Sequence, residues 1–160
     1  MISIVSKFYK GYLEGEGKLA KTHDLVSLVA RFYVAQVFFN AGLTKIQDWD
    51  TTLFLFEEEY QVPFLPFELA AYLGTLGELI LPVLLLTGVL TRFSAVGLFF
   101  VNVVAVISLV EIAPAALYLH YIWGLVLAQI IIYGGGVLSV DHVSSRFLIN
   151  RQNTELERTL

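Results

Sequence analysis

The stretch from Phe93 to Val140 constrains this chain more than any other feature, because Glu111 is its only Asp, Glu, Lys or Arg. A helix of a soluble bundle needs a polar stripe, and this stretch provides none. Over the whole chain of 160 residues, charged side chains make up 15%, against about 25% in an average soluble domain. The chain is therefore predicted to be an integral membrane protein.

Four apolar stretches are long enough to cross about 30 Å of hydrocarbon as helices of roughly 20 residues. They are residues 25–43, 67–88, 91–110 and 115–138. Membrane-spanning strands are not expected, because the runs are too long and do not alternate. The sequence thus predicts an all-α fold, a four-helix transmembrane bundle within residues 25–140, flanked by residues 1–24 and 141–160.

The charged residues are sorted by side, which predicts the orientation of the spans. Eight basic residues fall on one side: Lys7, Lys10, Lys18, Lys21, Arg92, Arg146, Arg151 and Arg158. Only Lys45 lies in a loop on the other side, where acidic residues collect instead. We expect a multi-pass protein of the bacterial inner membrane with both termini in the cytoplasm.

Three segments outside the spans carry structural predictions. Within residues 1–24, the segment Ile2–Leu13 places its apolar side chains on one helical face, which favours an interfacial helix on the anionic inner leaflet; a frayed tail is the alternative. Asp141 is expected to cap a short helix, His142–Ile149. Residues 45–66 mix aromatic and acidic side chains, which favours a short amphipathic helix that covers the bundle as a lid, docking surface or interfacial anchor.

Glu78 is the strongest candidate for a functional residue, because an ionisable group at membrane depth is costly. It lies in the middle of the second span, four residues before Pro82. A helical proline leaves the carbonyl four residues earlier without its hydrogen bond and favours a kink. Two interpretations of Glu78 stay open: a proton-relay or ligand-binding group, and a structural hydrogen bond to another helix.

The other polar residues inside the spans are also candidate ligand contacts: Arg31, His120, Asn102 and Gln129. Asn102 and Gln129 are expected at mid-depth, where each could donate to Glu78 or join helices. Arg31 could reach the headgroups or turn inward. Lys45 is added because its spacing from Arg31 places both on one helical face. No metal site is predicted, since the other histidines fall on the opposite side from His120.

Several chemistries are excluded or disfavoured by composition. The chain has no cysteine, so it cannot form a disulfide, a thiolate metal site or an iron–sulfur cluster by itself. Its basic residues form no patch of the kind that binds nucleic acid. No self-contained catalytic motif is visible, which leaves open whether the chain is an enzyme.

Four segments together resemble the DoxX family of small bacterial membrane proteins, over about Val26 to Asp141. They are RFYVAQVFFNAGLTKIQDW, EEEYQVPFLP, LGTLGELILPVLLLTGVLTRFSA and GGGVLSVD. The resemblance implies a four-helix membrane bundle. It also implies redox partners, since some members are subunits of quinone-reducing sulfur oxidoreductases. The stretch FEEEYQVPFLP looks more like a subgroup found beside maturation systems for copper-binding peptides.

The leading hypothesis is an inner-membrane accessory or redox subunit that binds a small lipid-soluble molecule near Glu78. A quinone is the favoured cofactor. The alternative is a non-enzymatic scaffold in the lipid bilayer that recruits a protein partner for peptide maturation, metal handling or detoxification. A small transporter that works as a homo-oligomer is a third hypothesis.

Overall fold

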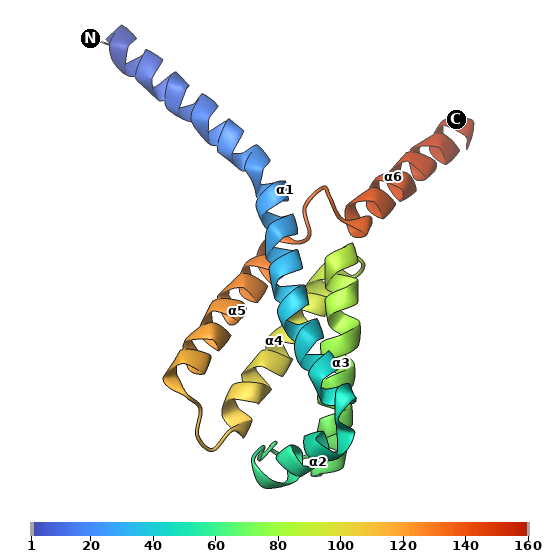
Figure 1. The fold of residues 1–160 in the computed structure, drawn as a ribbon. Helices are drawn as coiled ribbons and strands as arrows, with labels where there is room; N and C mark the ends of the chain where they lie inside the picture. The colour runs from blue at the N-terminus through green and yellow to red at the C-terminus, as the bar shows by residue number, and fades with distance from the viewer. Residues whose placement is uncertain (1, 160) are drawn as a thin grey trace.

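The computed structural model describes residues 2–159, which form only helices and their connections apart from one isolated bridge between Tyr60 and Leu109. In chain order the helices are α1 (Ile2–Gln47), α2 (Trp49–Glu58), α3 (Phe67–Thr87), α4 (Thr91–Ser108), α5 (Pro114–Tyr133) and α6 (Val140–Thr159), as Figure 1 shows. Four helical segments are long and apolar enough to span a membrane: Thr22–Gln47, α3, α4 and α5. The predicted all-α, four-helix membrane bundle is confirmed.

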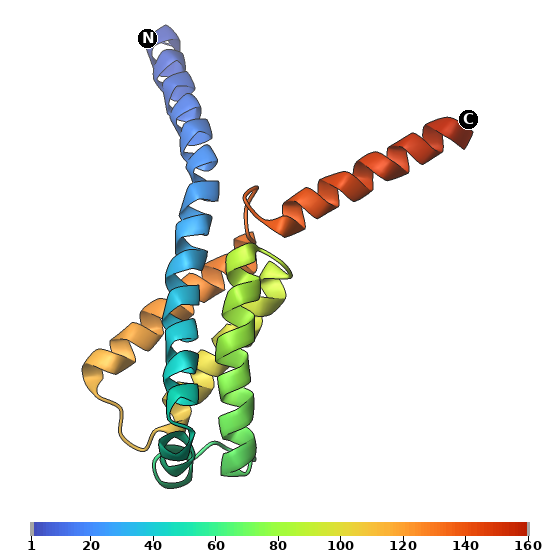
Figure 2. The same cartoon turned by 45° about the vertical axis from the view of Figure 1, so that its right-hand side comes forward.

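The bundle has two distinct ends. The N-terminal part of α1 and the whole of α6 extend away from one end, which we call the termini end, and α2 covers the other, the α2 end (Figures 1 and 2). The segment predicted to be a separate interfacial helix is helical, but it is continuous with the first span in α1. Its placement on a membrane surface stays a prediction.

The turn between α3 and α4 lies at the termini end and depends on Gly88. This residue has φ of 75°, in the left-handed region, and its N–H donates to Leu84 O at 3.0 Å. Only glycine adopts this conformation without a steric penalty. The helix therefore stops after Thr87, and α4 runs back antiparallel to α3. Pro82 lies inside α3, whose helical conformation continues through it to Thr87.

The prediction that Asp141 caps its own helix is wrong. Its two carboxylate oxygens accept from the N–H groups of Leu90 at 2.9 Å and Thr91 at 2.8 Å, so Asp141 caps α4 instead. The hydroxyl of Ser139 takes the expected place at α6 and accepts from His142 N–H at 3.3 Å. An oxygen at a helix start satisfies N–H groups that have no partner within the helix.

The C-terminal region also differs from the predicted boundaries. Helix α5 ends at Tyr133 rather than Leu138, because Gly134 turns the chain at φ of 80°. Helix α6 then runs from Val140 to Thr159, well beyond the short His142–Ile149 helix that was expected. Asp24 holds the turn against α1 by accepting from Val137 N–H at 2.8 Å.

The apolar core lies where α1, α3, α4 and α5 meet. Its buried members are Val34, Phe38, Leu85, Ala95, Leu98, Leu127 and Ile130. A smaller cluster forms at the α2 end, where Phe56 packs on Ala70 and Ala71 of α3. The short helix predicted within residues 45–66 is thus confirmed as α2, which contacts α3.

Candidate functional site

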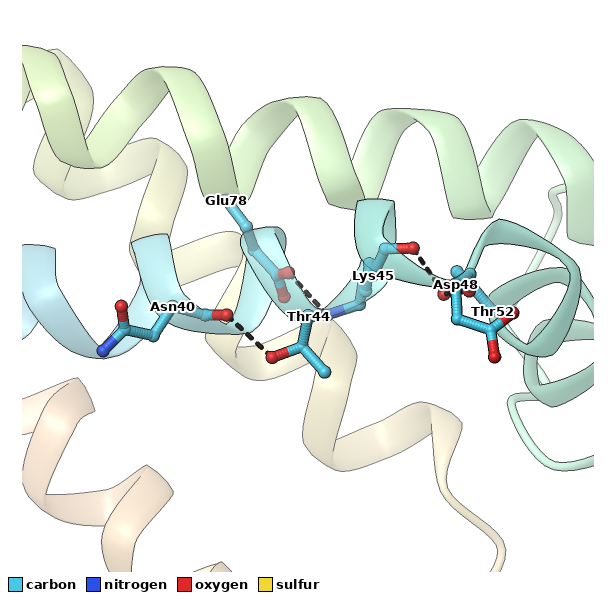
Figure 3. A network of polar contacts seen from close by, with 6 residues as sticks. All are labelled: Asn40, Thr44, Lys45, Asp48, Thr52 and Glu78. Carbon is cyan, nitrogen blue, oxygen red and sulfur yellow. Dashed lines mark hydrogen bonds and ion pairs between the residues drawn. The ribbon is translucent and has the colours of Figure 1, made fainter.

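Glu78 and Lys45 form an ion pair between α3 and α1 (Figure 3). Lys45 Nζ lies 2.5 Å from Glu78 Oε2, and the Glu78 side chain is only 9% exposed. Glu78 lies near the middle of α3, whereas Lys45 belongs to the last turn of α1. The partner of Glu78 is therefore a cation rather than an amide. A buried charge is tolerated when it is paired in this way.

Gly42 allows the two helices to approach closely enough for this pair. A Cβ atom at Gly42 would lie 2.9 Å from Leu79 Cγ and 3.1 Å from the Glu78 Cβ. Since Gly42 stands one turn before Lys45, the contact sets both the distance and the level of the ion pair. The glycine thus serves the α1–α3 interface directly.

The turn between α1 and α2 holds the backbone of Lys45 in place. The buried hydroxyl of Thr52 donates to the carbonyl oxygens of Lys45 and Asp48, each at 2.9 Å (Figure 3). Asp48 in turn accepts from Thr51 N–H at 3.0 Å and so caps α2. The Lys45 backbone is therefore held by two helices while its side chain reaches Glu78.

A pocket of about 230 Å³ adjoins the ion pair. It lies between α3 and α4 beneath α2 and the following segment, and its walls are mainly apolar. Its lining includes Lys45, Phe56, Tyr60, Leu73, Gly74, Glu78, Phe100, Val104 and Ser108. Leu73, Phe100 and Val104 are also exposed on the outside of α3 and α4. The pocket therefore opens towards the surface that lipid would cover.

Tyr60 and Ser108 are pocket residues that the sequence analysis did not single out. Burial, together with the negative charges of Glu59 and Glu78, raises the pKa of the Tyr60 phenol, which stays protonated at neutral pH. The only sequence signal at Ser108 is a hydroxyl residue at the end of an apolar run. Tyr60 follows an acidic run in a segment that sequence alone does not place against α4.

Arg31 is turned inward and lies at the termini end, away from the pocket. Its side chain is fully buried, and Nη2 donates to Leu138 O at 2.6 Å. Nη1 lies 3.4 Å from the carbonyl oxygens of Leu85 and Leu86 near the end of α3. A cation among helix C-terminal carbonyls is electrostatically favourable. The geometry gives Arg31 a structural role in joining α1, α3 and the segment before α6.

Asn102 and His120 pair with each other across α4 and α5. The Asn102 Nδ2 donates to His120 O at 3.0 Å, and its Oδ1 lies 2.8 Å from His120 Nδ1. Of the two roles expected for Asn102, these contacts join helices α4 and α5 and do not involve Glu78. A second, apolar pocket of about 600 Å³ lies over this pair. The two amide contacts make the pair a polar link between neighbouring spans.

Gln129 is partly buried on α5 and does not line the Lys45–Glu78 pocket. The six candidate residues thus separate into four places in the bundle: the Lys45–Glu78 pair, the Asn102–His120 pair, Arg31 and Gln129. Lys45 and Glu78 meet in the pocket between α3 and α4, whereas Asn102 and His120 line the second, apolar pocket. Among the residues whose side chains the structure describes, no group of three or more His, Asp or Glu is arranged to hold a metal ion.

Comparison with known proteins identifies the family of the chain. The DoxX family matches residues 26–111, a shorter range than the resemblance to Asp141, and this range contains every residue that lines the Lys45–Glu78 pocket. The chain is 33% identical over 123 residues to an uncharacterized protein of Haemophilus influenzae, covering 71% of this chain and 80% of the relative. No solved structure matches the chain. The chain belongs to the DoxX family.

Proposed function

We propose that this protein binds a small lipid-soluble molecule in the pocket beside Lys45 and Glu78. The observation that carries the proposal is a charged pair at the base of an apolar pocket that opens on the outside of two membrane spans. Ligand pockets of this kind combine apolar walls with a few polar groups that fix orientation. A ligand dissolved in the bilayer could enter sideways between α3 and α4.

A quinone is the ligand class that fits this chemistry best. The Lys45 ammonium can donate to a quinone carbonyl, and the Glu78 carboxylate can accept from a quinol hydroxyl. The volume of about 230 Å³ is below the usual range of roughly 300–1,000 Å³ for drug-sized ligands. The pocket therefore suits a ring headgroup, with an apolar tail left in the lipid. The protein would then act as an inner-membrane accessory or redox subunit.

Extraction of bound lipids tests this proposal. The full-length protein is purified from native membranes in a mild detergent, and its organic extract is compared with that of the bulk membrane by mass spectrometry. We expect quinone to be enriched with the wild type and lost with Glu78→Gln or Lys45→Met. Glu68→Gln is the matched control, because Glu68 is an exposed acid on the same helix. Equal quinone content in all four proteins, or none in any, would contradict the proposal.

A second candidate function is the recruitment of a protein partner at the termini end. Two helices, the start of α1 and the whole of α6, leave this end (Figure 2), and the observation that favours recruitment is a set of exposed aromatic and aliphatic side chains on them. Phe8 is 80% exposed on α1, and Phe147 is 70% exposed on α6. Exposed apolar patches of this kind mark interaction sites.

Affinity purification separates this function from ligand binding. We expect a partner to be recovered with the wild type and lost when Phe147 and Leu148 are both replaced by Ser, while Glu78→Gln recovers it unchanged. Recovery of the same proteins by the double variant would exclude α6 as the recruiting surface.

A further inference from the structure

The pocket beside Lys45 and Glu78 has a second polar end. Ser108, the last residue of α4, lines the pocket and is only 2% exposed. Its hydroxyl is buried and makes no hydrogen bond with any described residue. Buried hydroxyl groups without a partner are rare in folded proteins, so each one calls for an explanation.

Ser108 is held in place by the segment that follows α2. The Gln61 N–H donates to Ser108 O at 2.8 Å, and Tyr60 forms an isolated antiparallel bridge with Leu109. The Tyr60 ring packs on Phe56 with centroids 4.9 Å apart, and Tyr60 also lines the pocket. Backbone contacts thus bring two hydroxyl-bearing residues to the same end of the pocket.

The two polar ends are separated along the bundle. Val101 on α4 lies beside Gly77 on α3, because a Cβ atom at Gly77 would be 3.3 Å from Val101 Cγ2. Since Gly77 precedes Glu78, Val101 marks the level of the charged end on α4. Ser108 follows Val101 by two helical turns, which amounts to about 10 Å along α4. Val104 and Ala105 line the wall between these levels. The pocket is therefore an apolar slot with a charged end and a hydroxyl end.

Other unpartnered hydroxyls do not share this position. Thr75 on α3 and Ser94 on α4 are also buried without a hydrogen-bond partner, but neither lines the pocket. Ser108 differs because the free volume lies beside it. A hydroxyl can donate to or accept from an oxygen placed in that volume.

We propose that Ser108, with Tyr60 beside it, is the second anchor of the ligand that binds at Lys45 and Glu78. The ligand is then a ring-sized apolar molecule with an oxygen at each end, lying along α3 and α4. This inference rests on the proposed function, because it requires a ligand in that pocket. It excludes molecules with a single polar end, such as simple alkylphenols, as the preferred occupants.

Two probes that differ in one polar end test the inference. Decylubiquinone carries oxygens on opposite sides of its ring, and 4-decylphenol carries one. Their dissociation constants are measured by titration of the full-length protein in detergent. We expect Ser108→Ala to weaken decylubiquinone binding about twofold to tenfold, as for one lost hydrogen bond. Binding of 4-decylphenol should change by less than about twofold.

Matched variants keep the experiment decisive. Ser94→Ala removes a buried, unpartnered hydroxyl from the same helix outside the pocket, so it should leave both constants unchanged. Tyr60→Phe removes only the phenolic oxygen and should weaken decylubiquinone alone, which provides a second test if Ser108→Ala does not fold. Thermal unfolding without ligand checks the fold of each variant.

The outcomes separate this inference from the proposed function. If Ser108→Ala and Tyr60→Phe both bind decylubiquinone like the wild type while Glu78→Gln does not, the second anchor is refuted and the ligand site stands. If neither probe binds the wild type, the proposed function fails for this ligand class and the inference fails with it.

Discussion

At the scale of single residues, the Lys45–Glu78 pair decides what this pocket can bind. A carboxylate inside a membrane span is costly unless it is compensated, and here an ammonium lies 2.5 Å away. The pair leaves further acceptor positions on Glu78 and further donors on Lys45. The same contact can therefore support the fold and still offer hydrogen bonds to a ligand.

Removing one partner of the pair should destabilise the protein more than removing both. Lys45→Met leaves Glu78 buried without a counter-charge, and we expect a loss of up to about 3 kcal/mol. The double variant Lys45→Met with Glu78→Leu should regain most of that loss, since no unpaired charge remains. Thermal unfolding in detergent measures both. Additive losses in the double variant would show that the two side chains act independently.

The polar residues inside the spans could be selected from the sequence, but their partners could not. Membrane depth alone marks Glu78 and Arg31 as unusual. Lys45 pairs with a residue 33 positions away, and helical periodicity carries no information about contacts between helices. The contact between Asn102 and His120 could not be predicted for the same reason. Which polar groups contact each other depends on how the spans are rotated relative to one another.

At the scale of the elements, three glycines and one aspartate decide how the helices meet. Gly42 allows α3 to approach α1 closely, and Asp141 caps the start of α4. Gly88 and Gly134 end α3 and α5 in conformations with positive φ. The apolar runs predicted the helices well, because length and hydropathy determine which segments span a bilayer. The end of α5 was missed, since an apolar run continues past the glycines at which the helix stops.

Enlarging Gly42 should separate α1 from α3. Gly42→Val places methyl groups against Leu79 and Glu78, where even a Cβ has too little space. We expect a loss of about 1–3 kcal/mol from overpacking, together with weaker ligand binding. The control is Gly11→Ala, because no atom lies within 4 Å of a Cβ at Gly11. This variant should be neutral or slightly stabilised. Equal stability of Gly42→Val and the wild type, by thermal unfolding, would contradict the close contact.

The contact that Asp141 of α6 makes with the start of α4 should make the free energy of unfolding decrease at acidic pH. Burial raises the pKa of Asp141, but the hydrogen bonds from Thr91 and Leu90 and the charge of Arg31 outweigh it and lower that pKa overall. The contribution of the Asp141 carboxylate to stability is thus complete above the ordinary carboxyl pKa of about 4. It is lost as pH falls through the lowered pKa of the folded protein.

Asp141→Ala isolates this contribution. At neutral pH we expect it to cost about 1 kcal/mol, as for other helix caps. The difference from wild type should shrink as the buffer is acidified, because protonation removes the same interaction from the wild type. Unfolding curves between pH 7 and pH 3 measure this, with the exposed Glu111→Gln as the control. A difference that stays constant down to pH 3 would refute the capping role.

At the scale of the whole molecule, all extramembrane features are divided between two ends. The chain extensions lie at the termini end together with the start of α4, which carries Arg92, whereas α2 and its acids lie at the opposite end (Figure 1). This division agrees with the basic and acidic sorting in the sequence. We propose that the termini end faces the cytoplasm, as the distribution of Lys and Arg predicts.

The absence of cysteine makes the orientation easy to measure. Single cysteines are introduced at Ser145, at the exposed start of α6, and at Glu58, at the exposed end of α2. With a membrane-impermeant thiol reagent, spheroplasts should label Glu58→Cys, whereas Ser145→Cys should react only after the membrane is permeabilised. The reverse pattern would place the termini outside the cytoplasm.

Photo-crosslinking determines where a lipid-soluble ligand binds, and therefore whether the pocket between α3 and α4 holds it. An azido-quinone with a short tail is activated on the full-length protein in nanodiscs, and labelled peptides are mapped by mass spectrometry. We predict labelling confined to residues that line this pocket, on α3, α4 and the segment around Tyr60, that excess decylubiquinone prevents and Glu78→Gln abolishes. Labelling spread over all four spans, or unchanged by competitor and variant, would contradict the claim.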